Sequence, residues 1–517
     1  MQRSRVPIIL LVMLFANAAA VLFFRYFTTV DGPLHVFHAA LLPAPWTTNT
    51  QLAHDIIYDG NALPGWLGDR VLMVLLAFVP PQRAHDLFAA LVSCALILSV
   101  VTFLRAYGTR IRPAILWLLP ITFNFILLLG LFHFMVAVAI GFGTVACWKA
   151  RAHDPVARWL GLLLGLVVSF FAHRFGPVMV CVLFLPAFFV ELLQEHINRN
   201  KIARRPMLAR AAIVPMLLAL CALLIARFVK APPLPHANDL PALSDFFFLR
   251  PLYLLDHAKE QWMVRSIGVL FLISITAGIV ARYTLGRKVY WHDAILALFI
   301  GFILLTWLYS APSAGKLLVA ERSQWLALLM IAIWIIAMAD VPRKLPAWII
   351  GGAALCVVPI QLIRLVQAEA SFADLQQAHS STMEASAALA PGSMVMPVLA
   401  NHHWLFQHEA SYVAIDHDGI LLSAKEFVPY IHQDRRPHTR ERLPMRLDPY
   451  WLLRHWRSGI PPEIDQVLFI GSGIDQVVDK HPWPVLLSGK FVVGFENGYS
   501  RIYTRMQDPT PDAERER

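Results

Sequence analysis

The chain has 517 residues, of which 57% are hydrophobic and only 15% are charged. Soluble domains contain about 45–50% apolar and about 25% charged residues, so this composition excludes a soluble enzyme, a disordered chain and a collagen-like or disulfide-rich protein. The net charge of +10 would suggest nucleic-acid binding in a soluble protein. In a membrane protein it reflects basic loops that face the cytoplasm, so we predict no nucleic-acid partner.

Long apolar runs follow one another along the first two thirds of the chain. A spanning helix needs about 20 mostly apolar residues. The sequence therefore predicts an all-α polytopic membrane domain over residues 1–366 with about 11 transmembrane helices. The predicted spans are 7–25, 86–104, 113–130, 132–148, 158–172, 177–193, 211–229, 264–282, 293–310, 324–340 and 346–366.

The run 66–79 is also apolar, but it contains Asp69 and Arg70 and stops at Pro80-Pro81. We interpret it as a helix that lies on the membrane surface within a large first external loop, residues 26–85. With this choice, Arg3 and Arg5 place the amino terminus in the cytoplasm, and every later basic cluster falls on the same side. These clusters are Arg105/Arg110/Arg112, Lys149/Arg151/Arg158, Arg199/Lys201/Arg204/Arg205/Arg210, Arg282/Arg287/Lys288 and Arg343/Lys344.

The remaining residues, 367–517, have an ordinary soluble composition. Residues 373–390 are typical of a helix, whereas Met394–Leu399, Gln466–Ile470 and Lys490–Phe495 are typical of short strands. Asn497-Gly498 indicates a hairpin turn, because both residues tolerate positive φ. We predict a small α/β or α+β soluble domain on the periplasmic face.

Candidate catalytic residues open the first external loop. Gly32-Pro33 favours a tight turn directly after Asp31, which would place the carboxylate at the lip of the membrane. His35 and His38 would follow one helical turn apart on one face. A carboxylate in hydrogen-bond reach can take a proton from an attacking hydroxyl. Alternatively Asp31 only caps the helix that begins near Pro33, and the two roles do not exclude each other.

Other ionisable residues cluster at the predicted outer ends of the spans. Such residues are costly at membrane depth and are functional candidates. Cations there can hold a phosphate and stabilise its charge as it departs, although Arg322 could also extend to the lipid headgroups. The candidate substrate-binding residues of this group are His133, His173, Arg174, Lys316 and Arg322.

The sequence supports neither a metal site nor a cofactor. The five cysteines all lie in apolar runs and form no CxxC motif. The tail contains a second histidine group, which lacks further spaced ligands, so we interpret it as a solvated or substrate-contacting surface. Its members are His402, His403, His408 and His417.

The arrangement of a first span, an acidic residue opening a long external loop and a surface helix resembles the GT-C superfamily of membrane glycosyltransferases. Asp31-Gly32-Pro33-Leu34-His35 and the stretch Pro64–Asp69 are similar to segments of uncharacterised bacterial members. The resemblance implies a polyprenyl-phosphate-linked sugar as donor, Asp31 as the catalytic base, and Trp66 and Asp69 near the substrate. Many members carry a pair of acidic residues where this chain has one aspartate, which weakens the case for a divalent metal.

The leading hypothesis is therefore an inverting glycosyltransferase of the bacterial cytoplasmic membrane. It would move a sugar from a polyprenyl-phosphate donor to an acceptor on the outer face of the membrane. The predicted partners are this lipid-linked sugar and the surrounding membrane lipid. The alternatives are a polytopic transporter or lipid flippase, and a catalytically inactive scaffold of envelope assembly. The sequence does not identify the sugar, the acceptor or the oligomeric state.

Overall fold

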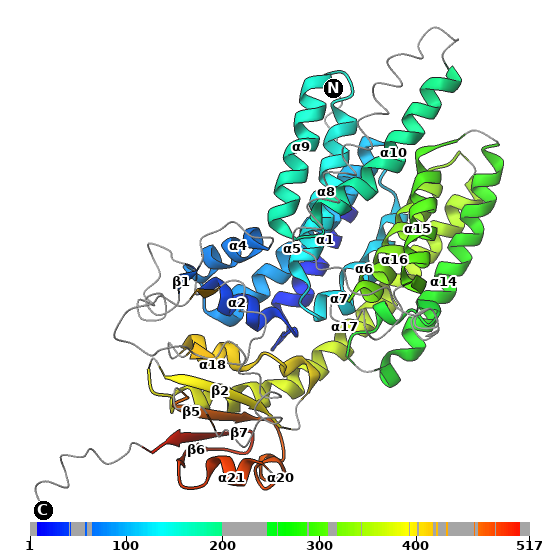
Figure 1. Cartoon of the computed structure of the whole chain (residues 1–517). Coiled ribbons are helices and arrows are strands. Elements are labelled where there is room, and N and C mark those ends of the chain that lie inside the picture. The colour runs from blue at the N-terminus through cyan, green and yellow to red at the C-terminus, as the bar shows by residue number, and fades with distance from the viewer. Residues whose placement is uncertain are drawn as a thin grey trace, which may run out of the picture. The chain divides into compact units, whose positions relative to one another are not determined.

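The chain folds into two compact units (Figure 1). Unit 1 comprises Met1–Phe24, Ala62–Gly68 and Ala89–Ser371, and unit 2 comprises Arg25–Asn61, Asp69–Phe88 and Phe372–Arg517. The computed structural model describes residues 8–40, 42, 57–58, 65–198, 246–255, 257–286, 289–308, 318–342, 344–391, 393–400, 403–416, 420–421, 431–432, 460, 464–480 and 482–506.

Unit 1 is a bundle of apolar helices. Within the described residues, eight helices are long and apolar enough to cross a membrane, and each coincides with a predicted span. They are α5 (Pro81–Ala106), α8 (Phe132–Ala150), α9 (Pro155–Ala172), α10 (Gly176–Asn198), α14 (His257–Thr284), α15 (Trp291–Leu308), α16 (Val319–Met338) and α17 (Lys344–Ser386). The helix α1 (Ile8–Leu22) is shorter, and the predicted span 211–229 lies outside the described residues.

The predicted span 113–130 is not one continuous helix. It consists of η1 (Pro113–Leu118), α6 (Leu119–Thr122) and α7 (Phe125–Leu128). Pro120 begins the second piece, and the Asn124 side chain accepts hydrogen bonds from the backbone of Ile126 and Leu127, which starts the third. Proline and an asparagine cap interrupt the helical hydrogen bonds although the composition stays apolar. The total of 11 spans stays a prediction.

Packing separates a central helix from lipid-facing ones. Every residue of α16 from Ser323 to Met338 is buried. The helices α9 and α15 are mostly exposed and carry large apolar side chains outward, among them Leu160, Leu164 and Leu304. Exposed apolar surface of this extent is unfavourable in water and suits contact with lipid.

The predicted helix over 66–79 corresponds to α4 (Trp66–Leu76), which has 11 residues, and its position on the membrane surface stays a prediction. At 1.5 Å per residue it is about 16 Å long, roughly half the hydrocarbon thickness of a bilayer, so it is too short to cross.

Basic residues gather at one end of the unit 1 helices. Arg158 at the start of α9 pairs with Glu191 near the end of α10 at 2.6 Å, and Arg282 near the end of α14 pairs with Asp293 at the start of α15 at 2.6 Å. A ring contact between Tyr107 and Trp291 joins the ends of α5 and α15. The described basic residues at these helix ends are Arg105, Arg110, Arg112, Lys149, Arg151, Arg158, Arg282 and Lys344.

Unit 2 contains a mixed five-stranded sheet of order β3-β2-β5-β7-β6 (Figure 1). The strands are β2 (Met394–Leu399), β3 (Ile420–Leu421), β5 (Gln466–Ile470), β6 (Phe491–Glu496) and β7 (Ser500–Arg505). The pairs β2–β3 and β2–β5 are parallel, whereas β5–β7 and β6–β7 are antiparallel. The predicted small carboxyl-terminal sheet is thus present, and its strands lie close to the predicted ranges. The Asn497 side chain accepts from the backbone of Tyr499 and Ser500 and closes the predicted hairpin.

Helices cover both faces of this sheet. Successive side chains of a strand point to opposite faces, and both sets are apolar and buried here. One face packs against α20 (Ile474–Val478) and α21 (Trp483–Leu487). The other face packs against the end of α17, against α18 (Ala410–Asp416) and against α2 (Gly32–Ala40). The helix of the first external loop is therefore part of the core of the carboxyl-terminal sheet.

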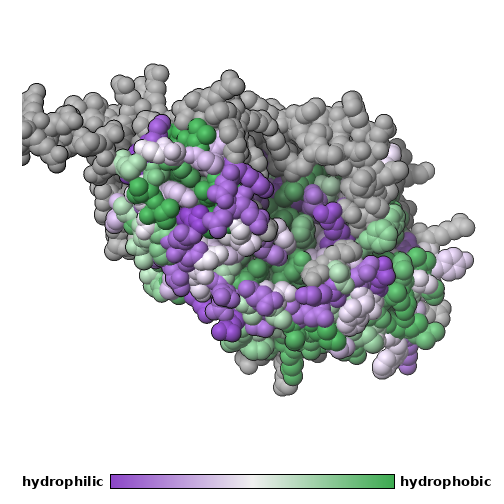
Figure 2. All heavy atoms as spheres, turned by 90° about the horizontal axis from the view of Figure 1, so that it is seen from below, coloured by the Kyte–Doolittle hydropathy of each residue, from purple (hydrophilic) through white to green (hydrophobic). Residues whose placement is uncertain are grey.

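Two further features join the first loop to the tail within unit 2. The strand β1 (Ile57–Tyr58) pairs antiparallel with β4 (Ile431–His432). The predicted helix 373–390 is the end of α17, so the expected boundary at 366–367 lies inside a continuous helix. Figure 2, seen from below relative to Figure 1, shows a face with many hydrophilic residues among apolar ones. In and next to α20, Asp475, Asp479 and Lys480 are exposed. This surface suits water.

Candidate active site

Asp31 directly precedes α2, and its backbone carbonyl accepts the first helical hydrogen bond, from His35. Asp31 thus occupies the capping position that the sequence allowed. The turn before it is fixed by Thr29, whose hydroxyl accepts from the backbone nitrogen of Gly32 at 3.0 Å. A side chain on Gly32 would collide with the His85 ring and the Thr29 hydroxyl, so only glycine fits there.

Behind this turn lies a buried polar chain. The Thr29 hydroxyl lies 3.0 Å from Nε2 of His85, and Nδ1 of His85 lies 3.3 Å from a carboxylate oxygen of Asp86. Gln82 and Arg83 contact the same carboxylate. The order of hydroxyl, imidazole and carboxylate resembles a nucleophilic triad, but Thr29 and His85 are fully buried. A hydroxyl that is fully buried is not accessible to a substrate. We therefore interpret this series of hydrogen-bonded side chains as a support for the turn that contains Asp31.

One histidine, His408, lies beside Asp31 in unit 2. Nε2 of His408, in the segment before α18, lies 3.6 Å from Oδ1 of Asp31, and both side chains are mostly buried. Burial, followed by the charge of His38, lowers the pKa of His408 to about 4. The imidazole of His408 is therefore neutral at pH 7.

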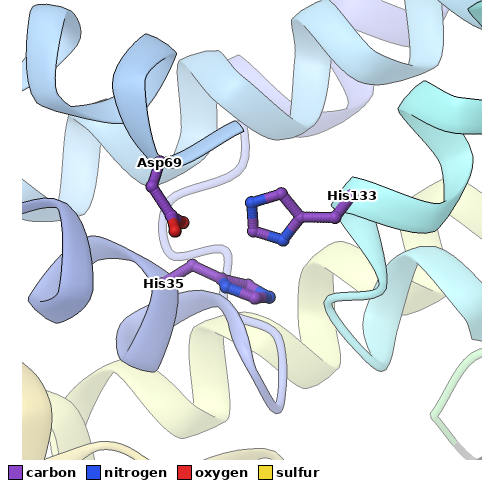
Figure 3. Close-up of side chains that lie close together, drawn as sticks. All are labelled: His35, Asp69 and His133. Carbon is purple, nitrogen blue, oxygen red and sulfur yellow. The ribbon is translucent and has the colours of Figure 1, made fainter. Parts of the chain in front are cut away.

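His35 and Asp69 form a second pair in unit 2. Figure 3 shows the Asp69 carboxylate from α4 pointing toward the His35 ring from α2, and their ligand atoms lie within 4.8 Å of one another. The ring of His38 follows on α2, 6.4 Å from the ring of His35. An imidazole and a carboxylate are ligands that a divalent metal accepts, so the expectation of a centre without metal stays a prediction.

A buried carboxylate anchors the segment that carries His408. Glu409 is fully buried, and it accepts a hydrogen bond from the Tyr26 hydroxyl at 3.2 Å. Nδ1 of His379, on the last part of α17, also pairs with Glu409, and the His379 ring stacks on the Tyr26 ring at 4.6 Å. Burial and the Glu409 charge raise the pKa of the Tyr26 hydroxyl well above its usual value, so it stays protonated as a donor.

Unit 1 brings four of the predicted substrate-binding residues together. His173 and Arg174 follow the end of α9, His133 lies at the start of α8, and Arg322 lies at the start of α16. The Arg322 guanidinium lies 5.1 Å from the centre of the Phe134 ring and 5.9 Å from that of Phe175. These helix ends are the ones opposite the basic end.

The unit 1 residues also affect one another electrostatically. Burial, followed by the charges of Arg322, Arg174 and His133, lowers the pKa of His173 well below its usual value. Two guanidinium groups therefore surround a neutral imidazole, which is a suitable environment for an anion. Gly176 makes the turn possible, because a side chain there would meet the backbone carbonyl of Ser169.

Trp66 belongs to the same part of unit 1. Its ring lies 6.1 Å from the ring of Phe171, and the backbone nitrogen of Gly65 donates to the carbonyl of Phe171 at 3.0 Å. Trp66 thus contacts Phe171, which precedes His173 by two residues at the end of α9. The predicted Lys316 and the tail residues His402 and His417 lie outside the described residues.

Several residues of the candidate site were missed by the sequence analysis. His408 was interpreted as part of a tail surface and instead lies mostly buried beside Asp31. Glu409, His379, Tyr26 and His85 were not singled out. Their partners are far away in the chain, so no local motif marks them.

Neither a protein-family profile nor a curated protein sequence matches the chain. Among solved structures, the chain is similar to ArnT from Cupriavidus metallidurans in a crystal structure with bound undecaprenyl phosphate. The likeness covers 97% of this chain and 98% of that chain, with 11% sequence identity and a TM-score of 0.37. A likeness of this size does not assign a family, so a function can be inferred only from the residues of the candidate site.

Proposed function

We propose that the chain is a membrane glycosyltransferase of the GT-C kind that uses a polyprenyl-phosphate-linked sugar. The observation that carries the proposal is the placement of Asp31. Its carboxylate is 29% exposed, lies at a turn that admits no side chain on Gly32, and has His408 beside it. A carboxylate that is held in place but still reachable is what a general base requires.

The proposed reaction is a single displacement. The oxygen of the acceptor hydroxyl forms a bond to the anomeric carbon while the bond between that carbon and the phosphate oxygen breaks. The electron pair leaves with the lipid phosphate, and the hydroxyl proton passes to Asp31. One displacement inverts the anomeric carbon and needs no covalent intermediate. His35 and His38 would position Asp31 or the donor phosphate.

The cations of unit 1 are proposed to bind the phosphate. Arg174 and Arg322 can donate charge-assisted hydrogen bonds to phosphate oxygens, and the neutral His173 can add another. Trp66, Asp69 and His133 are also proposed to contact the substrate. Lys316 keeps its proposed role as a further cation.

The outer face of the cytoplasmic membrane is the proposed location of the reaction. The basic helix ends of unit 1 are assigned to the cytoplasm by the positive-inside rule. Helices α5 and α17 continue into unit 2 through their opposite ends. Unit 2 would then face the periplasm, in keeping with its hydrophilic surface.

A transporter or flippase is the rival proposal, and the charge distribution weighs against it. Transporters often place ionisable groups near the middle of their spans. In the described spans, charged side chains lie near the helix ends. Arg364 of α17 is fully buried, but it is not in the middle of the span. It follows the start of α17 by 20 residues, which is about 30 Å along the helix axis and close to the thickness of the hydrocarbon core. It lies 3.9 Å from Glu260 near the start of α14.

The test is the variant Asp31→Asn, assayed with a radiolabelled polyprenyl-phosphate sugar and purified protein in liposomes. We expect transfer to fall by at least about 10²-fold, because the amide cannot accept the proton. The control is Asp479→Asn, an exposed aspartate of unit 2, which should retain full activity. Full activity of Asp31→Asn would disprove the base, and lipid flipping without any transfer product would favour the transporter.

A further inference from the structure

We propose that His408 is a positioning residue that holds the carboxylate of Asp31 in its reactive orientation. The inference rests on the proposed function of Asp31 as the base. It assigns to the carboxyl-terminal segment a part in a centre that otherwise belongs to the first external loop.

The backbone around His408 is fixed on both sides. It lies between η5 (Trp404–Phe406) and α18, and its carbonyl accepts from the backbone nitrogen of Ser411 at 3.0 Å. The helices α18 and α2 pack on the same face of the sheet through Val413 and Phe37, among others. The two helices that follow His408 and Asp31 in the chain are thus held by one hydrophobic core, which sets the distance between the side chains.

Glu409 fixes the neighbouring position. A buried carboxylate is costly unless it is paired, and Tyr26 and His379 supply its partners. Tyr26 lies five residues before Asp31, so the same carboxylate ties down the chain that leads into the catalytic turn. His408 therefore presents its Nε2 to Asp31 from a rigid support, as a positioning group requires.

The charge state of His408 suits this role. It has Asp31 and His38 as neighbours and Glu409 beside it in the chain, and its lowered pKa keeps the ring neutral above about pH 4. A cationic partner would stabilise the ionised carboxylate and weaken it as a base. A neutral ring adds no positive charge beside the carboxylate. With Nε2 at 3.6 Å it limits the orientations of Asp31 and lowers its basicity less than a cation would.

The test compares three substitutions that differ in which ring nitrogen they replace. The amide of His408→Gln reaches roughly as far as Nε2, that of His408→Asn only as far as Nδ1, and His408→Ala supplies neither. We expect kcat for sugar transfer to fall about 10–100-fold in His408→Ala and His408→Asn, with KM within about twofold. His408→Gln should recover most of kcat.

The matched control is His403→Asn in the same segment. Nδ1 of His403 accepts from the backbone of Leu405, and asparagine can replace that contact, so kcat should be unchanged. If His408 had only a structural role, both His408→Gln and His408→Ala would lower the stability of the protein and reduce kcat to the same extent. Equal kcat in His408→Gln and His408→Ala would therefore overturn the proposal.

A second measurement does not depend on glycosyl transfer. Asp31 is labelled with a hydrophobic carbodiimide over a range of pH, and the labelled peptide is quantified by mass spectrometry. His408→Ala should shift the pH profile of Asp31 labelling, whereas His408→Gln and His403→Asn should leave it unchanged. An unshifted profile in His408→Ala overturns the positioning role even if the chain proves to transfer no sugar, and a shifted profile in an inactive chain removes only the proposed function.

Discussion

At the scale of single residues, the candidate centre combines a capping aspartate with histidines that stay neutral. Asp31 starts α2 and still exposes part of its carboxylate, so the structural and the catalytic interpretations coexist. The pKa values of His408 and His173 are both lowered, first by burial and then by nearby positive charge. The imidazoles can therefore donate hydrogen bonds at neutral pH without adding charge.

The lowered pKa of His408 predicts a pH dependence of stability. In the unfolded chain this histidine protonates near pH 6.5, whereas in the folded protein it does so near pH 4. The unfolded state thus binds more protons between these values, and the free energy of unfolding falls as the pH falls from 6.5 to 4, by up to about 3 kcal/mol. Thermal unfolding of the protein in detergent should show this loss, which His408→Gln should reduce.

The comparison uses His403→Asn as the reference, since it keeps His408. Its melting temperature should fall with pH as steeply as that of the unchanged protein, while that of His408→Gln should fall a few degrees less. Parallel curves for all three proteins would contradict the neutral state of His408.

At the scale of elements, α2 is the helix on which the site depends. Its Leu34 and Phe37 are 4% and 1% exposed and lie in the core of the sheet of unit 2. Substitution of a buried phenylalanine by alanine costs about 3–5 kcal/mol, since contacts are lost and a cavity remains. Because α2 carries the catalytic turn, the loss should affect both stability and activity.

The prediction is that Phe37→Ala lowers the melting temperature and reduces sugar transfer, measured on the same purified sample. The matched substitution Val485→Ala removes an exposed side chain of unit 2 and should change the free energy of unfolding by less than about 0.5 kcal/mol. A Phe37→Ala protein as stable as Val485→Ala would show that α2 is not held by this core.

Which elements could be predicted depends on whether their signal is local. The eight long helices and the strands at 394–399 and 466–470 follow from apolar run length and composition, which are local properties. The break at 113–128 was missed because its composition stays apolar, although Pro120 and Asn124 are visible signals. The packing of α2 on the sheet joins distant segments and leaves no trace in either one.

The same reasoning explains which site residues were found. Asp31, His173 and Arg322 stand out because charged or titratable groups at the ends of apolar runs are rare. Glu409 and His379 lie in polar segments where such residues are common, and only the fold gives them partners. Sequence reasoning therefore selected the ionisable groups at the ends of apolar runs and missed Glu409 and His379.

At the scale of the whole molecule, the proposal depends on the sidedness of the membrane. The basic helix ends of unit 1 predict that the amino terminus lies in the cytoplasm and the carboxyl terminus outside. Alkaline phosphatase fused after residue 517 should be active in bacterial cells, since that enzyme folds only outside the cytoplasm. A fusion to a cytoplasmic reporter, β-galactosidase, at the same position should be inactive. The reverse pattern would contradict the outer-face reaction.

The packing of α2 on the sheet of unit 2 also has a consequence for biosynthesis. The ribosome makes α2 near the start of translation, whereas β2, β5 and β7 emerge only near the end. During that interval the nascent helix lacks the sheet that covers Leu34 and Phe37, so these apolar side chains stay exposed. A chain released early would contain Asp31 but not the carboxyl-terminal residues that pack around it.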